Sequence, residues 1–265
     1  MIRKQSNVTF RIGAALALLI AGITIASFFY LPYDCNAMDS GSRFSPPSAK
    51  HLMGTDNFGR DVFSRIMAGA KYTLLTAIIT VAGSAAIGCV IGLLCGFAGG
   101  FWDEATMRLM DALSSFPGIL LALVMVSLMG NSQRTLVIAL LVLFIPGFTR
   151  IMRSGMLQYK NRDFVLAARI AGISRLRIIF VHIFPNLSPT LLSASALGLS
   201  NAILAESTMS YLGLGIQPPV PSWGRMLSES QTFIFNAPWC TLSPGIMIML
   251  TVLAFHYLGD GFKNP

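Results

Sequence analysis

The chain has 265 residues, of which 54% are hydrophobic and only 11% are charged. An ordinary soluble domain carries roughly a quarter charged residues, so the composition excludes that class and predicts a membrane protein. The formal net charge of +8 comes from basic residues scattered beside apolar runs, a pattern that favours membrane topology signals over a nucleic-acid partner.

Six uncharged runs along the chain predict six membrane-spanning helices. Most of them reach the roughly 20 residues that a helix needs to cross the hydrocarbon core. The runs cover residues 12–33, 72–102, 112–133, 135–149, 178–205 together with 207–224, and 230–259. Because the run 135–149 is short, we expect the side chains of Arg134 and Arg150 to extend toward the membrane surfaces. A helix satisfies its own backbone hydrogen bonds, so we predict an all-α membrane protein.

We expect one membrane domain over residues 1–265. The first helix is predicted at 12–31, because its apolar run is too long for a secretory signal and no small-residue cleavage site follows. A polar outer segment follows at 32–71. The other five helices form a transport core at 72–265, which includes a cytoplasmic loop at 150–186.

The outer segment combines an irregular part with a predicted amphipathic helix. Three prolines between residues 32 and 47 favour extended chain. Thr55 or Asp56 can then cap a helix in which Asp61 and Arg65 lie at i, i+4. Its apolar positions are Phe58, Val62, Phe63 and Ile66. We expect this helix to lie at the outer membrane surface.

Glycine and proline residues mark close packing and bends. Gly88, Gly92 and Gly96 repeat every four residues in the second run, a spacing that permits close packing either within the chain or between two chains. The pair Phe116-Pro117, and Pro146, are expected to kink or start helices.

The distribution of basic residues predicts that both termini lie inside the cell. With the N-terminus inside, 12 of the 19 Lys and Arg residues fall on the cytoplasmic side. The loop between Arg150 and Asn186 contributes most of this bias, with seven basic residues and one acidic residue. That loop is therefore predicted to be cytoplasmic.

The cytoplasmic loop contains a helix of small residues that ends at a glycine. The sequence Asp163-Phe-Val-Leu-Ala-Ala-Arg-Ile-Ala-Gly172 precedes His182-Ile-Phe-Pro-Asn186. Small side chains permit close approach of a partner, and a glycine can adopt the positive φ that ends a helix. This spacing resembles the EAA signature of the membrane subunits of ABC importers, although Leu166 stands where that family usually has glutamate. The alternative is an ordinary juxtamembrane loop that attracts anionic lipid.

Further blocks extend the resemblance along nearly the whole chain. The blocks are His51 to Asp61, Asp103 to Asp111 with Phe116-Pro117, Glu206 to Gly215 continuing to Arg225, and Phe255 to Gly261. Together they are similar to the second permease subunit of dipeptide, oligopeptide and nickel ABC importers. Short segments near residues 31–45 and 104–108 resemble the nickel branch more than the peptide branches. The outer-segment motif consists of Gly54, Thr55, Asp56, Gly59, Arg60 and Asp61.

The resemblance implies a type I ABC importer fold with six membrane helices, an outer amphipathic helix and a cytoplasmic coupling helix. It implies four kinds of contact: a second homologous permease in a heterodimer, two cytoplasmic ABC ATPases, an extracytoplasmic solute-binding protein, and the bacterial inner membrane. The chain has no G-x-x-x-x-G-K-[ST] loop, so we expect it to bind no cofactor and the partner ATPases to use ATP and Mg²⁺. The ATPase-coupling residues are then Phe164 as apolar anchor, Ala167, Ala168 and Ala171 as the close-approach surface, Gly172 as the turn, and Arg175.

Glu206 is the one acidic residue inside a predicted membrane run. A buried acid is costly unless it faces a cavity or a partner, so Glu206 is a candidate for the translocation path. The alternative is a structural acid that is hydrogen-bonded between helices, because Ser207, Thr208 and Ser210 follow it. His182 and His256 are isolated and make a poor ligand set, so no metal ligand is assigned.

Two other classes of function remain as alternatives. A membrane-embedded enzyme would need convergent catalytic groups, and the sequence contains neither HExxH nor GxSxG, nor a pair of acids within the membrane runs. We therefore expect no enzymatic activity. A secondary transporter or channel that works without ATP would more often show internal repeats and several polar residues inside the membrane.

Overall fold

The computed structural model describes residues 2–263, and the side chains of residues 2–7 and 263 are not described. The predicted cytoplasmic positions Arg3, Lys4 and Lys263 therefore lie outside the described side chains. The longer helices are α1 (Ile2–Phe29), α2 (Val62–Ala98), α3 (Gly100–Ser115), α4 (Gly118–Met129), α5 (Gln133–Tyr159), α8 (Phe184–Tyr211) and α10 (Pro238–Lys263). The short ones are η1 (Ser40–Ser42), α6 (Asp163–Ile170), α7 (Arg175–Arg177), η2 (Ile178–Ile183), α9 (Trp223–Ser230) and η3 (Gln231–Phe233).

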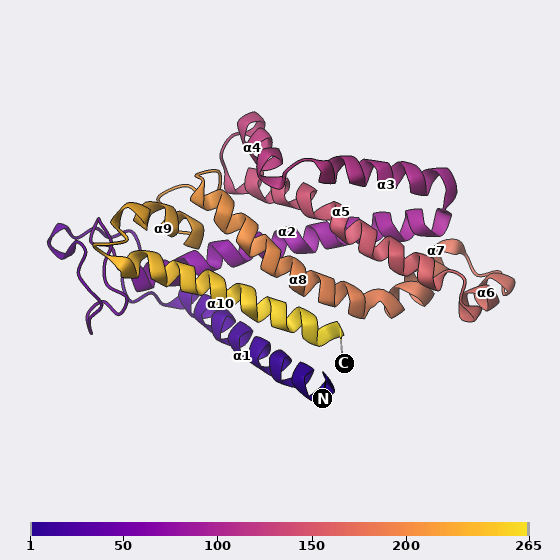
Figure 1. Cartoon of the computed structure of the whole chain (residues 1–265), viewed down its shortest axis with the longest axis horizontal. Helices are drawn as coiled ribbons and strands as arrows, with labels where there is room; N and C mark the ends of the chain where they lie inside the picture. The colour runs from indigo at the N-terminus through magenta and orange to yellow at the C-terminus, as the bar shows by residue number, and fades with distance from the viewer. Residues whose placement is uncertain (1, 264–265) are drawn as a thin grey trace.

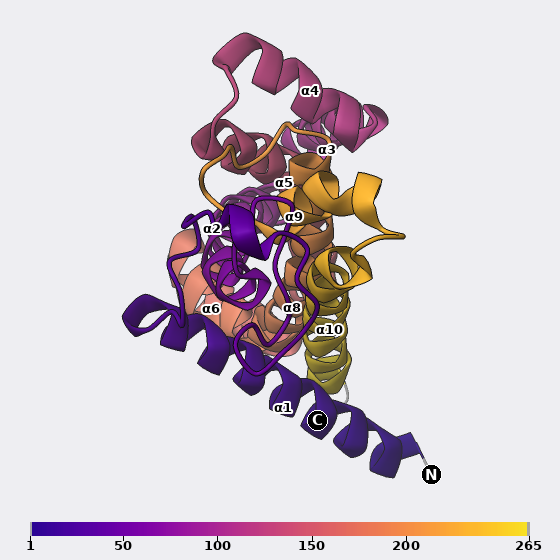
Figure 2. The ribbon, with the colours of Figure 1, turned by 90° about the vertical axis from the view of Figure 1, so that its left-hand side faces the viewer.

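The long helices form one elongated bundle (Figure 1). The segment 30–61 and α9 occupy one end, which we call the outer end, and α6 projects from the opposite end. The start of α1 and the finish of α10 lie beside each other on the half that carries α6 (Figure 1), and the rings of Phe10 and Phe262 are in contact there, with centroids 5.7 Å apart. Figure 2 shows α1 crossing one side of the bundle and α4 standing on the other.

The helices that can span a membrane confirm the predicted all-α class. In the part of the chain that the structure describes, five helices are long and apolar enough to cross, and the bent pair α3 and α4 gives a sixth if it is counted as one span. The predicted continuous helix over 112–133 is therefore wrong. The chain bends by 87° between α3 and α4, because Pro117 lacks an N–H and forces the preceding Phe116 into extended backbone.

The outer amphipathic helix was predicted wrongly. Residues 62–71 are the first turns of the spanning helix α2, so the outer segment ends at residue 61 and not at 71. The cap is neither Thr55 nor Asp56 but Asp61, whose carboxylate accepts a hydrogen bond from the Ser64 N–H at 2.8 Å. The apolar positions of this stretch reflect burial within the bundle, since Val62 and Ile66 belong to the core.

Three further boundaries differ from those predicted. Helix α1 begins at Ile2 and not at 12, and residues 150–159 are the last turns of α5. The segment that leaves the bundle at the end opposite the outer end is therefore about residues 160–174. The run 178–205 with 207–224 ends as a long helix at Tyr211, where α8 stops, and the helix predicted at 230–259 begins only at Pro238, as α10. The amphipathic helix α9 lies between them.

The glycine repeat of α2 packs inside the chain. A Cβ added at Gly92 would overlap the carbonyl oxygen of Thr149, and one at Gly88 would lie 2.7 Å from the Phe148 Cβ. Gly96 faces Met156 on the same helix, α5. Of the two possibilities that the spacing left open, the structure shows the internal one: the backbones of α2 and α5 approach closely along these glycines.

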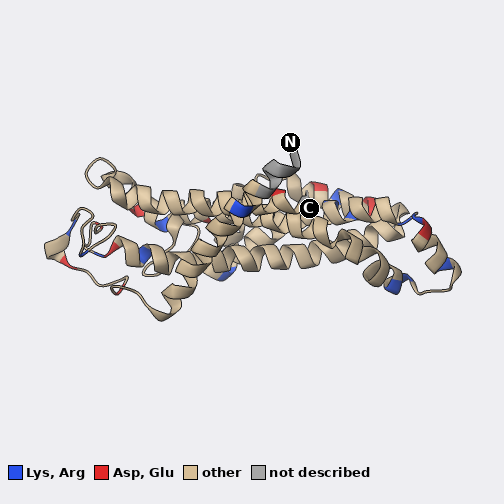
Figure 3. Cartoon of the chain, turned by 90° about the horizontal axis from the view of Figure 1, so that it is seen from below, with Lys and Arg blue, Asp and Glu red and all other residues tan. Residues whose placement is uncertain are grey.

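Charged residues gather toward the two ends of the bundle and along α3 (Figure 3). The greater part of the long helices carries no charge, which is what a hydrocarbon environment requires. Polar and charged residues form two assemblies, one around α6 and one around α9.

Candidate functional site

Helix α6 is a short helix with a defined start and stop. Asp163 lies in its first turn, where a negative charge is favourable. At its end Gly172 has a φ of +73°, the Gly172 N–H donates to the Arg169 carbonyl at 3.0 Å, and the Ile173 N–H donates to the Ala168 carbonyl at 3.1 Å. This pair of bonds is a Schellman motif, which requires a residue that tolerates positive φ.

One face of α6 is packed against the bundle. Val165 is fully buried and Ala168 is buried, and both belong to an apolar cluster formed by α2, α5, α6, η2 and α8. The buried members of this cluster are Cys89, Leu93, Met152, Met156, Val165, Ala168, Ile178, Ile179, Ile183 and Leu187. The assignment of Ala168 to the docking surface was therefore wrong, because the turn of the helix directs it inward.

The other face of α6 is exposed and apolar. Ile170 is 89% exposed and Phe164 is 41% exposed, with Ala167 and Ala171 exposed beside them. Ile170 was not predicted as a site residue, although it lies two residues before the glycine that ends the helix. Ile170 and Phe164 thus leave an apolar surface on the exposed face of this projecting helix, a feature that marks candidate interaction sites.

Polar contacts connect the α6 segment to the ends of neighbouring helices. The Lys160 ammonium donates to the Gly96 carbonyl at 3.1 Å, near the last turn of α2. The guanidinium of Arg169 stacks over the Phe97 ring at 5.2 Å. Arg175 is exposed and, with Arg169, lines a cavity of about 450 Å³ beside the end of α2. These contacts join the α6 segment to the end of α2.

A salt bridge also joins α3 and α5 on this side. The Arg153 Nε donates to one Asp103 oxygen at 2.5 Å, and a terminal guanidinium nitrogen donates to the other at 2.7 Å. This two-point geometry fixes both side chains, which is the strongest arrangement available to an arginine and a carboxylate.

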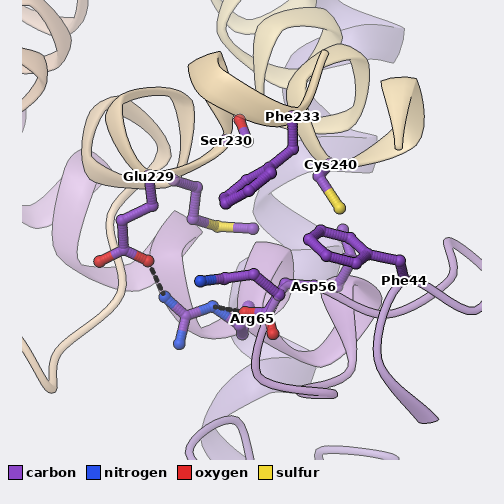
Figure 4. Close-up of a pocket in the computed structure, with 10 residues that line it drawn as sticks. Phe44, Asp56, Arg65, Glu229, Ser230, Phe233 and Cys240 are labelled. Carbon is purple, nitrogen blue, oxygen red and sulfur yellow. Dashed lines mark hydrogen bonds and ion pairs between the residues drawn. The ribbon is translucent and has the colours of Figure 1, made fainter. Parts of the chain in front are cut away.

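At the outer end, five charged residues form what we call the outer charge cluster: Asp56, Arg60, Arg65, Arg225 and Glu229. Arg60 and Arg65 each donate to the same Glu229 oxygen at 3.1 Å, and Arg225 donates to the other oxygen at 3.1 Å. Figure 4 shows Arg65 between Asp56 and Glu229, beside the rings of Phe44 and Phe233. The cluster joins the outer segment, α2 and α9. The i, i+4 pair predicted between Asp61 and Arg65 is not formed.

The rest of the outer-segment motif shapes the chain beneath this cluster. The Thr55 hydroxyl accepts from the Ser45 N–H at 2.8 Å and donates to the Ser42 carbonyl. Gly54 and Gly59 have φ values of +71° and +75°, and a Cβ added at Gly59 would overlap the Asp39 carbonyl. Hydrogen bonds from the Ser42 hydroxyl and the Gly41 N–H lower the pKa of Asp39. All six motif residues therefore lie in one compact folded loop.

Glu206 lies in the interior, where it is fully buried. One carboxyl oxygen accepts from the Ser210 hydroxyl at 2.7 Å, and the other receives no hydrogen bond from the described residues. The structure thus places Glu206 away from any surface that a solute could reach in this conformation. Its burial agrees with the alternative of a structural acid, but its hydrogen bond lies within α8 and not between helices as that alternative expected.

A large groove lies between α5 and α8. It has a volume of about 660 Å³, and most of its wall is apolar, with a few hydroxyl and amide groups. Its lining includes Phe144, Phe148, Thr190, Ser193, Asn201 and Phe262. Sequence reasoning missed this groove, because it depends on which faces of two distant segments meet.

No group of three His, Cys, Asp or Glu residues that could hold a metal ion occurs in the described part of the chain. His256 instead lies 3.5 Å from the Asp260 carboxylate on its own helix. The four cysteines are free and three of them are buried.

Comparison with known proteins agrees with this geometry. Residues 88–263 match the family described as binding-protein-dependent transport system inner membrane component. A dipeptide transport system permease protein, DppC, from Alkalihalophilus pseudofirmus is 39% identical over 256 residues, covering 93% of this chain and 84% of the relative. The chain belongs to this permease family. It is a membrane subunit of an ABC importer, a class that works with separate ATPase subunits.

A second relative and a solved structure are also similar to the permease. A glutathione transport system permease protein, GsiD, from Pectobacterium atrosepticum is 37% identical and covers 98% of this chain and 86% of the relative. The fold is similar to that of the MetNI methionine ABC transporter in an inward-facing structure. That match has a TM-score of 0.61 and 16% identity, and it covers 72% of this chain and 91% of the other.

Proposed function

We propose that this permease forms a translocation path with a second, homologous permease, and that two cytoplasmic ATPases dock on the α6 segments of the pair. The observation that carries the proposal is the division of α6 into two faces. One face is packed into the bundle through Val165, and the other presents Ile170 and Phe164 to the outside. A helix held from behind with an apolar tip is suited to receive a push from a partner.

The coupling follows from the contacts of α6. ATP and Mg²⁺ bind to the ATPases, and their closure moves α6. The apolar cluster and the Lys160 bond transmit this movement to α2 and α5. The permease then shifts between an inward-open and an outward-open state, a two-state change biased by the ATPases.

The proposed solute is a short peptide, delivered by an extracytoplasmic solute-binding protein. Relatives at 36–39% identity are named as permeases for dipeptides, peptides and glutathione. The groove between α5 and α8 is mostly apolar with hydroxyl and amide groups, which suits peptides better than a bare metal ion. The slight preference of the sequence for the nickel branch finds no support among these names.

The proposed location is the bacterial inner membrane, with both termini in the cytoplasm. The half of the bundle that carries α6 also carries the start of α1 and the finish of α10 (Figure 1). The excess of basic residues on that side supports the same orientation.

Uptake by reconstituted proteoliposomes tests this function. The complete complex of permease pair, ATPases and binding protein is supplied with a labelled dipeptide or with labelled nickel. We expect ATP-dependent uptake of the dipeptide, its loss in Ile170→Asp, and its retention in the control Ile170→Leu. Uptake of nickel in place of peptide would show that the protein belongs to the metal branch. Unchanged uptake in Ile170→Asp would show that α6 does not couple the permease to the ATPases.

A further inference from the structure

Glu206 occupies an unusual position near the outer end of α8. It is fully buried in a helix that spans the membrane. A carboxyl group in such a place is costly, so its retention calls for a physical role. The Ser210 hydroxyl, one turn further along the same helix, donates a hydrogen bond to the Glu206 Oε1 at 2.7 Å.

Ser210 connects this carboxyl group to the chain that follows α8, residues 212–222. The Ser210 Oγ also accepts a long hydrogen bond from the Ile216 N–H, at 3.4 Å. Gly215 packs so closely that an added Cβ would overlap the Ser210 hydroxyl. The 212–222 connection therefore folds back onto the face of α8 that carries Glu206.

The first turn of α9 closes over the same place. A Cβ added at Gly224 would overlap the Ser207 carbonyl oxygen. The fully buried Trp223 donates its Nε1–H to the Ile66 carbonyl at 3.0 Å, and its backbone N–H donates to the Thr73 hydroxyl at 3.4 Å. Glu206 thus lies where α2, α8 and α9 meet, with the hydroxyls of Thr73 and Ser207 as neighbours.

We propose that Glu206 is a positioning residue: through Ser210 it holds the 212–222 connection and the first turn of α9 against α8 and α2, and so keeps the outer end of the bundle closed. It does not contact the solute. The outer charge cluster fastens the other end of α9 through Glu229, so α9 is held at both ends. This inference rests on the permease function proposed above.

Charge is not needed for this role. Glu206 acts as a hydrogen-bond acceptor toward Ser210, and the amide oxygen of a glutamine can do the same. The glutamine N–H₂ could donate to either neighbouring hydroxyl. A role in binding a cation or the solute would require the carboxylate itself, so Glu206→Gln separates the two roles.

Hydrogen exchange of the assembled complex, measured by mass spectrometry without ATP or solute, tests the positioning directly. Loss of a typical hydrogen bond should speed exchange in 212–222 roughly fivefold in Ser210→Ala. We expect at least the same in Glu206→Ala and wild-type exchange in Glu206→Gln. The matched control is Thr208→Ala, because the exposed Thr208 hydroxyl donates to the Leu204 carbonyl on the same helix and does not contact Glu206. Because no transport is involved, this result is independent of which solute the complex moves.

Coupling supplies the functional readout. Ser210→Ala should raise ATP hydrolysis in the absence of binding protein and lower the solute moved per ATP, while Glu206→Gln should match the wild type. Two results would overturn the inference: Glu206→Gln as damaging as Glu206→Ala, or exchange in 212–222 that is the same in Ser210→Ala and in the wild type. An equal effect of Thr208→Ala would do so as well.

Discussion

Replacement of Ile170 by alanine should weaken the binding of the ATPase without unfolding the permease. Ile170 is 89% exposed, so its side chain contributes little to the folded chain. If docking buries it, the three carbon atoms removed in Ile170→Ala each cost about 0.8 kcal/mol. The total, about 2.4 kcal/mol, corresponds to roughly 60-fold weaker binding, since about 1.4 kcal/mol is a factor of ten.

Titration of a labelled ATPase subunit onto the permease pair in nanodiscs measures this change in Kd, and thermal unfolding measures stability. Val165→Ala is the matched comparison, because Val165 lies on the same helix but is fully buried. Val165→Ala should instead lower the melting temperature of the permease, because Val165 belongs to the apolar cluster formed by α2, α5, α6, η2 and α8. A Kd that changes less than about threefold in Ile170→Ala would refute the argument that this face docks.

Three other substitutions test the packing and charges of the bundle. Gly92→Ala should destabilise the permease by about 1–3 kcal/mol, because the new Cβ forces α2 away from α5, whereas Gly147→Ala, with open space around it, should leave the melting temperature unchanged; equal effects would contradict the close packing. Glu229→Gln should cost about 2 kcal/mol, because hydrogen bonds to charged groups contribute about 1.5–3 kcal/mol each, and unchanged thermal unfolding would show that α9 is held otherwise. Asp103→Asn should lower the free energy of unfolding, and replacing Arg153 in the same chain should add little further loss, which a double-mutant cycle measures. Losses that simply add would show that the salt bridge does not contribute to stability.

Hydropathy predicted the spans because the membrane imposes one requirement on every residue of a run. It could not place their ends. Residues 62–71 include charged side chains and were therefore assigned to the outer surface. They form the first turns of α2 instead, because the buried Arg65 is paired with Glu229, a residue far along the chain. The local pattern contains no information about that partner.

The coupling segment was predictable in position but not in orientation. The spacing of small residues before Gly172 indicated a short helix, and the structure has α6 there. Which side of the helix faces the bundle depends on how η2 and α8 return beneath it. Ala168 was therefore placed on the wrong face, and Ile170 was overlooked. Pro117 likewise predicted that the chain bends between α3 and α4, but not that the bend measures 87°.

We propose above that ATP hydrolysis by partner subunits drives solute through this permease. The most direct test compares dipeptide uptake by proteoliposomes that contain the permease pair with its ATPases and the same liposomes without ATPases, each with ATP or a non-hydrolysable analogue. We expect uptake only when the ATPases are present and the ATP can be hydrolysed. Equal uptake by the permease pair alone would contradict it and identify a transporter or channel that works without ATP.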